Sequence, residues 1–138
     1  MNLLKKVFTA TVLLVSFSSF AEVSVIVNNA NADTLNAKTI KRIYLGKMKA
    51  FPSGSKVTVL TLKDDAPATE SFRQSALKKS NSQFKSYWSK LAFTGKGTPA
   101  KELASAADML NAVKADVSTI GFVDSSAVTG DVKVIAKF

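Results

Sequence analysis

The residues best suited to chemistry lie in the stretch "LKDDAPATESF", which covers residues 62–72. The alternating apolar run before it is typical of a strand, and the residues after it are typical of a helix. A turn from strand to helix often binds anions, because the first N–H groups of the helix are free and its dipole is positive there. Lys63 and Thr69 add a cation and a hydroxyl to this turn. Its two carboxylates, Asp64 and Asp65, leave an ordinary capped helix as the alternative interpretation.

A second candidate site is Asp124-Ser125-Ser126, which directly follows an apolar run over Thr119–Val123. That run predicts a buried strand, and open α/β sheets bind ligands outside the carboxyl ends of their strands. Serine hydroxyls suit an oxyanion, but Asp-Ser-Ser is also a common turn or helix cap. The sequence leaves both interpretations open.

The composition excludes several kinds of catalysis. The chain has no histidine and no cysteine, so it can form no Ser-His-Asp triad, thiolate nucleophile, histidine zinc site or disulfide. Ser53, Ser75 and Ser82 each begin an S-x-x-K match, but serine and lysine are common enough here for chance matches. The segment Gly95-Lys96-Gly97-Thr98 lacks the spacing of a nucleotide-binding P-loop. We therefore expect a binding protein without catalytic residues, cofactor or metal.

Eight elements are expected to position these residues, in the order β-α-β-α-α-α-β-β. Strands are predicted over Val23–Asn28, Lys56–Leu62, Thr119–Val123 and Val132–Phe138, and helices over Leu35–Leu45, Pro67–Lys79, Ser82–Phe93 and from a Ser105 cap through Val113. The segment Phe93–Pro99 is predicted to be a loop. Early alternation of strands and helices predicts an α/β fold with a mixed, mostly parallel sheet flanked by helices, in which the last strand can pair antiparallel.

An aromatic helix face in the third predicted helix allows two interpretations. It consists of Phe84, Tyr87, Trp88 and Leu91. Aromatic residues at this spacing can form a ligand platform, but the spacing favours a face that packs against the core.

Residues 1–21 have the pattern of a secretory signal peptide. A basic start precedes an apolar run from Val7 to Phe20, and Ser19 and Ala21 place small residues before the expected cleavage point. A membrane anchor, the alternative, needs about 20 apolar residues, and this run is shorter. Removing these 21 residues from the 138 leaves 117, which suffice for one exported domain over residues 22–138. The periplasm is the expected location, with secretion into the medium as the alternative.

The charge balance favours anionic partners. The formal net charge is +9, and loss of Lys5 and Lys6 with the signal peptide would leave +7. Such a surface attracts phosphate and anionic polymers in general. The lysines are scattered along the sequence, so a solvated surface without a specific polyanion site is equally compatible with it.

Three phrases resemble a known family: "RIYLGK" over residues 42–47, "YWSKLAFTGKG" over 87–97 and "TIGFVDSSAV" over 119–128. Together they resemble one lobe of the type 2 periplasmic substrate-binding proteins. The nearest relatives by this resemblance are the phosphate-binding components of phosphate ABC transporters and their small single-lobe relatives. The resemblance covers nearly all of residues 22–138 and implies an α/β lobe with a mixed sheet.

The resemblance also implies a binding turn. In the phosphate binders, the turn after the second strand of this lobe carries Arg-x-Asp-Gly-Ser-Gly-Thr. Laid on this chain without gaps, the motif's arginine, aspartate and threonine fall on Lys63, Asp65 and Thr69. Its Gly-Ser-Gly centre is replaced by Ala66, Pro67 and Ala68. Proline removes an N–H donor, alanine adds Cβ atoms where glycine lets the backbone approach a ligand, and lysine lacks the two-pronged geometry of arginine.

The resemblance and the residues together predict an exported solute-binding-type domain that binds phosphate or a similar small oxyanion weakly. The domain would take part in ABC-type phosphate transport or sensing. Its protein partner would be a membrane permease or a second subunit. The predicted contacts are Lys63, Thr69 and the amides after Asp65, those of Ala66 and Ala68 included, with Asp65 orienting Lys63 and Ser125 and Ser126 as additional contacts. Asp64 is expected to repel a dianion, and a single lobe would leave the ligand on an open face.

The alternative function is a non-transport interaction module that has lost the ligand site. Its basic face would bind a protein or an anionic envelope polymer. Neither function requires a specific nucleic-acid partner or a membrane span in the mature chain.

Overall fold

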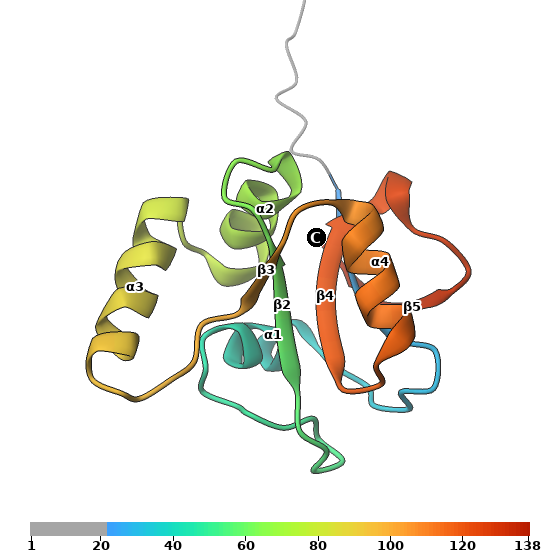
Figure 1. Cartoon of the computed structure of the whole chain (residues 1–138), viewed down its shortest axis with the longest axis horizontal. Coiled ribbons are helices and arrows are strands. Elements are labelled where there is room, and N and C mark those ends of the chain that lie inside the picture. Colours follow the sequence, from blue (N-terminus) through green and yellow to red (C-terminus); the bar gives the residue numbers. More distant parts are fainter. Residues whose placement is uncertain (1–21) are drawn as a thin grey trace, which may run out of the picture.

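The protein is described by a computed structural model over residues 22–138, and the predicted signal peptide lies outside the described residues. One five-stranded sheet forms the centre of the domain, with helices packed around it (Figure 1). The strands are β1 (Val23–Asn28), β2 (Thr58–Leu62), β3 (Lys101–Leu103), β4 (Thr119–Asp124) and β5 (Val132–Lys137). The helices are α1 (Ala37–Tyr44), α2 (Pro67–Phe72), α3 (Asn81–Phe93) and α4 (Ala106–Ala115). A π-helical turn, Arg73–Leu77, continues α2, and a 3₁₀ turn, Ser125–Ala127, follows β4.

The sheet is mixed, with the strand order β3-β2-β4-β1-β5. β2 runs parallel to both β3 and β4, whereas β1 runs antiparallel to both β4 and β5. The α/β fold, the mixed sheet and the antiparallel last strand are therefore confirmed. Fewer of the strand pairs are parallel than the sequence predicts. The reason is that β1 does not pair with β2 but lies between β4 and β5, two strands from the end of the chain.

The core is organised around β4, whose consecutive residues point to opposite faces of the sheet. Phe122 stacks on Phe72 of α2 with ring centroids 4.3 Å apart, and Tyr44 of α1 packs edge-on against Phe72 at 4.7 Å. Gly121 faces α4, where the Sδ atom of Met109 occupies the space that a Cβ would need. These contacts hold α2 and α4 against opposite faces of the sheet.

The capping residues that the sequence indicates are in place. Pro67 occupies the first turn of α2, Gly46 follows α1 with a φ of 71°, and the Ser105 side chain accepts a hydrogen bond from the Asp108 amide at 3.1 Å. The aromatic face of α3 is confirmed as a core face in part, since Phe84 and Trp88 are buried.

Two elements differ from the prediction. The predicted helix over Pro67–Lys79 changes to π winding at Arg73 and ends at Lys78, whose φ of 57° is left-handed. The segment Lys101–Leu103 forms the edge strand β3, which the sequence does not signal. Three residues are too few for an alternating pattern, and β3 exists through its parallel pairing with Leu60–Leu62.

Within residues 22–138, no helix combines the length and the apolar character that crossing a bilayer would require.

Candidate anion-binding site

The two predicted site segments follow β2 and β4. Because these strands are parallel neighbours, their carboxyl ends meet at the same edge of the sheet. Figure 1 shows α2 and the turn after β4 at this edge. The location is the one where open α/β sheets bind ligands.

The turn between β2 and α2 is closed by the carbonyl oxygen of Lys63. This oxygen accepts hydrogen bonds from the Ala66 amide at 3.0 Å and from the Thr69 hydroxyl at 2.7 Å. Thr69 is completely buried, with 0% exposure. Its hydroxyl therefore stabilises the turn and does not face solvent, although the sequence places it among the ligand contacts. The Lys63 side chain is exposed.

The start of α2 offers few backbone donors. Ala66 is the residue that precedes the helix and contributes no side-chain cap, and Pro67 has no N–H. The Thr69 amide already donates to the Ala66 carbonyl at 3.0 Å. Among the first residues of the helix this leaves the Ala68 amide without an acceptor in residues 22–138. Ala68 itself is buried, with 7% exposure.

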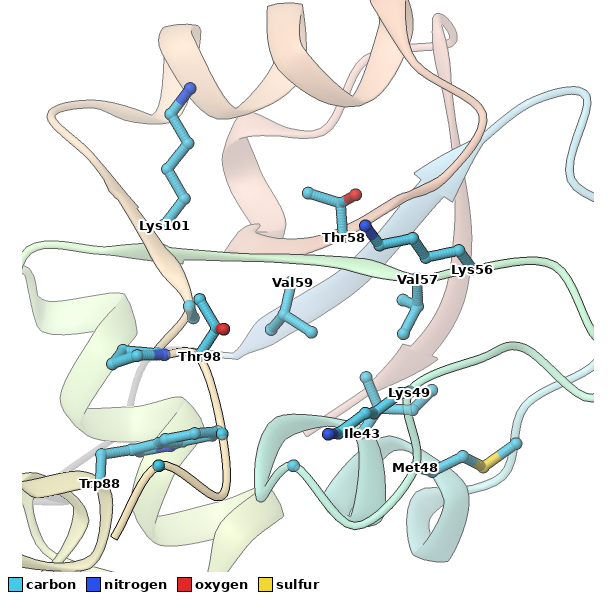
Figure 2. Close-up of a pocket in the computed structure, with 15 residues that line it drawn as sticks. Ile43, Met48, Lys49, Lys56, Val57, Thr58, Val59, Trp88, Thr98 and Lys101 are labelled. Carbon is cyan, nitrogen blue, oxygen red and sulfur yellow. The ribbon is translucent and has the colours of Figure 1, made fainter. Parts of the chain in front are cut away.

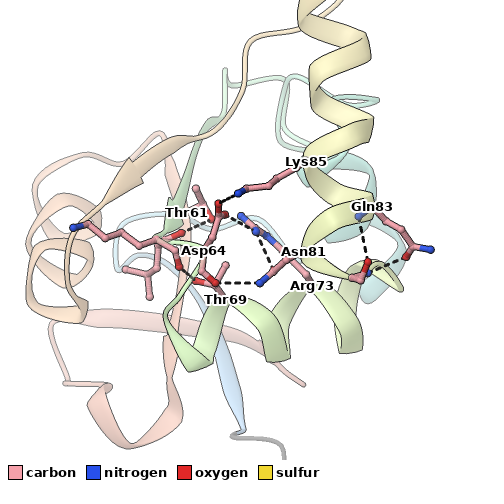
Figure 3. Close-up of polar contacts among 10 residues, drawn as sticks. Thr61, Asp64, Thr69, Arg73, Asn81, Gln83 and Lys85 are labelled. Carbon is pink, nitrogen blue, oxygen red and sulfur yellow. Dashed lines mark hydrogen bonds and ion pairs between the residues drawn. The ribbon is translucent and has the colours of Figure 1, made fainter.

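Asp64 lies at the centre of a charged network that the sequence does not reveal (Figure 3). One carboxylate oxygen accepts from Arg73 Nη1 at 2.7 Å and the other pairs with Lys85 Nζ at 2.8 Å. Arg73 is 3% exposed, lies over the Phe84 ring at 4.1 Å, and also donates to Asn81 Oδ1 at 3.0 Å. The Asn81 amide in turn donates to the Asp64 carbonyl at 3.1 Å.

This network determines the charge of Asp64. The hydrogen bond from Lys85, followed by that from Arg73, lowers the pKa of the Asp64 carboxyl below its usual value. Asp64 is therefore ionised, but two cations compensate its charge. The expectation that Asp64 repels a dianion is corrected accordingly: Asp64, Arg73 and Lys85 together carry one net positive charge.

Asp65 is expected from the sequence to lie beside Lys63 and orient its side chain, but the structure shows no such pair within residues 22–138. Asp65 is exposed and belongs to no ion pair within the described part of the chain. The predicted orientation of Lys63 by Asp65 thus has no ion pair to support it.

The serines after β4 form a closed local turn. The Ser125 hydroxyl hydrogen-bonds the Ser24 hydroxyl at 2.7 Å, and the Ser126 amide and hydroxyl both donate to Asp124 Oδ1, at 2.9 and 2.6 Å. The Ser126 hydroxyl, followed by its amide, lowers the pKa of the Asp124 carboxyl. This geometry matches the alternative interpretation, an ordinary capped turn.

Of the predicted contacts, the structure thus leaves the Lys63 cation and the Ala68 amide available to a ligand. The residues of the candidate site that sequence reasoning missed are Arg73 and Lys85, which pair with Asp64. Arg73 alone gave a signal, since a charged residue one position after the buried Phe72 requires a partner. No group of three or more acidic, histidine or cysteine side chains in residues 22–138 is arranged to hold a metal ion.

The described residues form an α/β lobe with a strand-to-helix turn at the carboxyl edge of parallel strands. Neither protein-family models nor curated protein sequences match the chain. Several solved structures do match the chain in fold. One is described as a phosphate ABC transporter substrate-binding protein with bound phosphate from Clostridium perfringens (TM-score 0.65, 16% identity, 84% of this chain and 45% of that chain).

Two further solved structures have the same fold. They are an ABC-type phosphate transport receptor from Vibrio cholerae (TM-score 0.56, 20% identity, 85% of this chain and 47% of that chain) and PstS from Borrelia burgdorferi (TM-score 0.55, 13% identity, 75% and 41%). The chain spans less than half the length of each of these proteins. At such identities the likeness establishes the fold, which is that of a single lobe.

Proposed function

We propose that residues 22–138 are an exported solute-binding-type domain that binds phosphate or a similar small oxyanion weakly at the β2–α2 turn. The observation that carries the proposal is the charge compensation of Asp64 by Arg73 and Lys85. The six charged groups around the turn are then balanced, with Lys63, Arg73 and Lys85 against Asp64, Asp65 and Glu70, and the turn offers an exposed lysine at the start of a helix. The likeness to phosphate receptors supports phosphate as the first candidate ligand.

The binding should be weak for two reasons. The Thr69 and Ser126 hydroxyls are engaged within the protein, and Pro67 donates nothing. Each charge-assisted hydrogen bond that is missing costs about 1.5–3 kcal/mol, so two of them lower the affinity by about two orders of magnitude or more. A single lobe also cannot enclose the ligand. We expect a dissociation constant on the order of 1 mM or weaker.

The proposal includes the cellular setting. Residues 1–21 direct export, and the periplasm is the location at which the domain meets its ligand. A membrane permease of an ABC-type phosphate transport or sensing system, or a second subunit, covers the open face and completes the site.

The alternative is an interaction module that binds a protein or an anionic envelope polymer through basic residues. The observation in its favour is that the three hydroxyls predicted to contact a ligand, those of Thr69, Ser125 and Ser126, all have partners within the protein. Binding of this kind should weaken steeply with salt, because it depends on the release of counterions.

Calorimetric titration of the processed protein with phosphate and with sulfate, at low and moderate salt, tests the proposal. We expect a saturable phosphate signal that Lys63→Ala abolishes and that Lys96→Ala leaves unchanged, because Lys96 lies beyond the far end of α3. Absence of both heat and thermal stabilisation at millimolar phosphate would contradict the proposal. Salt-sensitive binding of a polyanion in the same protein would then support the alternative.

A further inference from the structure

A cavity of about 450 Å³ lies at the opposite end of β2 from the anion-binding turn. Its walls come from residues 56–59 at the start of β2, from the end of α1, from Trp88 of α3, and from residues 97–101 leading into β3. Figure 2 shows these segments surrounding a common space. Because β3 pairs only with Leu60–Leu62, the space lies where β2 has no β3 neighbour.

The walls of the cavity are mixed, and their apolar part comes from valine, isoleucine and tryptophan side chains. The side chains of Val57, which directly precedes β2, and of Val59 in β2 point into the cavity. Ile43 of α1 and the Trp88 ring lie opposite them (Figure 2). Val57 and Ile43 are buried in the hydrophobic core, so this surface is continuous with it. A flat apolar group would gain contact area here on leaving water.

The indole of Trp88 is a fixed wall. A Cβ on Gly46 or Gly97 would lie 2.8 or 2.9 Å from the ring, so the backbone at both glycines packs directly against it. The Trp88 Nε1–H is buried and has no hydrogen-bond acceptor among the described residues. Such an unpaired donor costs about 1–3 kcal/mol. Because this atom has almost no exposed surface, the donor is not presented to the cavity.

The rim of the cavity is basic. Its lining contains Lys49, Lys56 and Lys101 but no aspartate or glutamate. None of these lysines belongs to an ion pair within residues 22–138. All three lysines are exposed, and in Figure 2 the Lys49 amine points to the inner side of the cavity, whereas Lys56 and Lys101 extend along its outside. The local potential is therefore positive beside an apolar surface.

We propose that this cavity is a second ligand site, which binds a small organic anion with one acidic group on a flat apolar body. The apolar body packs between the two valines and Trp88, and the carboxylate, sulfonate or phosphate group pairs with Lys49. Inorganic phosphate is a poor occupant, because it would leave the apolar walls in contact with water. A neutral aromatic compound should also bind weakly in the cavity, because it would leave the lysines without an anionic partner. The site is independent of the β2–α2 turn.

The proposal is tested by a proton–nitrogen correlation NMR titration of the processed protein with sodium naphthalenesulfonate. The chain has one tryptophan, so its single indole N–H signal reports on Trp88 alone. We expect saturable shifts of this signal and of the Val57 and Val59 amides. Neither inorganic sulfate nor naphthalene methanol at the same concentration should reproduce them.

Charge variants complete the test. Lys49→Glu should raise the dissociation constant for naphthalenesulfonate about fivefold or more, whereas Lys38→Glu, an equal charge change outside the cavity, should leave it unchanged. If Lys49→Glu does not fold, Lys49→Ala replaces it. Unsaturable shifts, shifts that spare Trp88, equal binding of the neutral compound, or equal effects of both variants would each overturn the proposal. None of these outcomes depends on phosphate binding at the turn.

Discussion

At the scale of a single residue, the sequence and the structure lead to different conclusions about the charge of Asp64. Next to Asp65 it looks like an obstacle to anion binding, because two adjacent carboxylates repel an anion. In the fold, Arg73 from nine residues later and Lys85 from α3 both pair with it. The turn sequence contains neither cation, so only the tertiary structure reveals the compensation.

The Asp64 network should make stability depend on pH. Because its pKa is lowered in the folded protein, ionised Asp64 stabilises the fold above the unfolded value of about 4, and this contribution disappears as the pH falls through the lower folded pKa. Asp64→Asn should therefore reduce the free energy of unfolding by about 1–3 kcal/mol near neutral pH, since buried Arg73 loses its partner.

Urea denaturation at about pH 7 and at about pH 3 measures this effect. The difference between Asp64→Asn and the unsubstituted protein should shrink at the lower pH. Asp65→Asn, an exposed and unpaired control, should change stability by no more than about 0.5 kcal/mol. An equal loss at both pH values would show that the charge of Asp64 is not responsible.

Thr69 provides a second test at the scale of one residue. Thr69→Val keeps the shape of the buried side chain but removes the hydrogen bond to the Lys63 carbonyl, and should lower the free energy of unfolding by about 1 kcal/mol. Thr69→Ser keeps the hydroxyl and is the matched control for the bond. Thermal unfolding of both variants measures the difference; a Thr69→Val variant as stable as the unsubstituted protein would count against a structural role for this hydroxyl.

At the scale of elements, the π-helical turn that continues α2 ends in a strained residue. Lys78 has a φ of 57°, in the left-handed region that glycine adopts without steric cost. Lys78→Gly should therefore increase the free energy of unfolding by about 0.5–1 kcal/mol. Lys79, at the next position, has no positive φ, so Lys79→Gly should not stabilise the protein. Chemical denaturation compares the two, and equal effects would contradict the argument.

The β2–α2 turn is the element on which the proposed function depends. Replacing Ala66, Pro67 and Ala68 with Gly-Ser-Gly restores an N–H, a hydroxyl and close backbone approach at the start of α2. We expect the triple variant to bind phosphate about tenfold more tightly than the unsubstituted protein, as measured by calorimetry. Unchanged affinity in a folded variant would indicate that the turn is not the binding element.

The elements were predictable where their signal is local. The periodicity of apolar residues located β1, β4, α3 and α4 to within a few residues, and Pro67, Gly46 and Ser105 marked helix ends through their backbone or side-chain chemistry. β3 and the π winding at Arg73 were not predictable, because they depend on a neighbouring strand and on the burial of an arginine. The same distinction applies to the site: the turn was located, but the directions of its side chains were not.

At the scale of the whole molecule, the match to a single lobe is the reason why we propose an open anion site with weak binding. The phosphate receptors with this fold are more than twice as long as the portion that this chain matches. The two candidate sites lie at opposite ends of β2.

The most direct test of the central claim is an NMR titration of the processed protein with inorganic phosphate, which follows every backbone amide. We predict saturable shifts centred on the Lys63 and Ala68 amides, absent in Lys63→Ala and absent at the Trp88 indole. Shifts that are unsaturable, or that occur at scattered lysines without the β2–α2 turn, would contradict oxyanion binding at this turn.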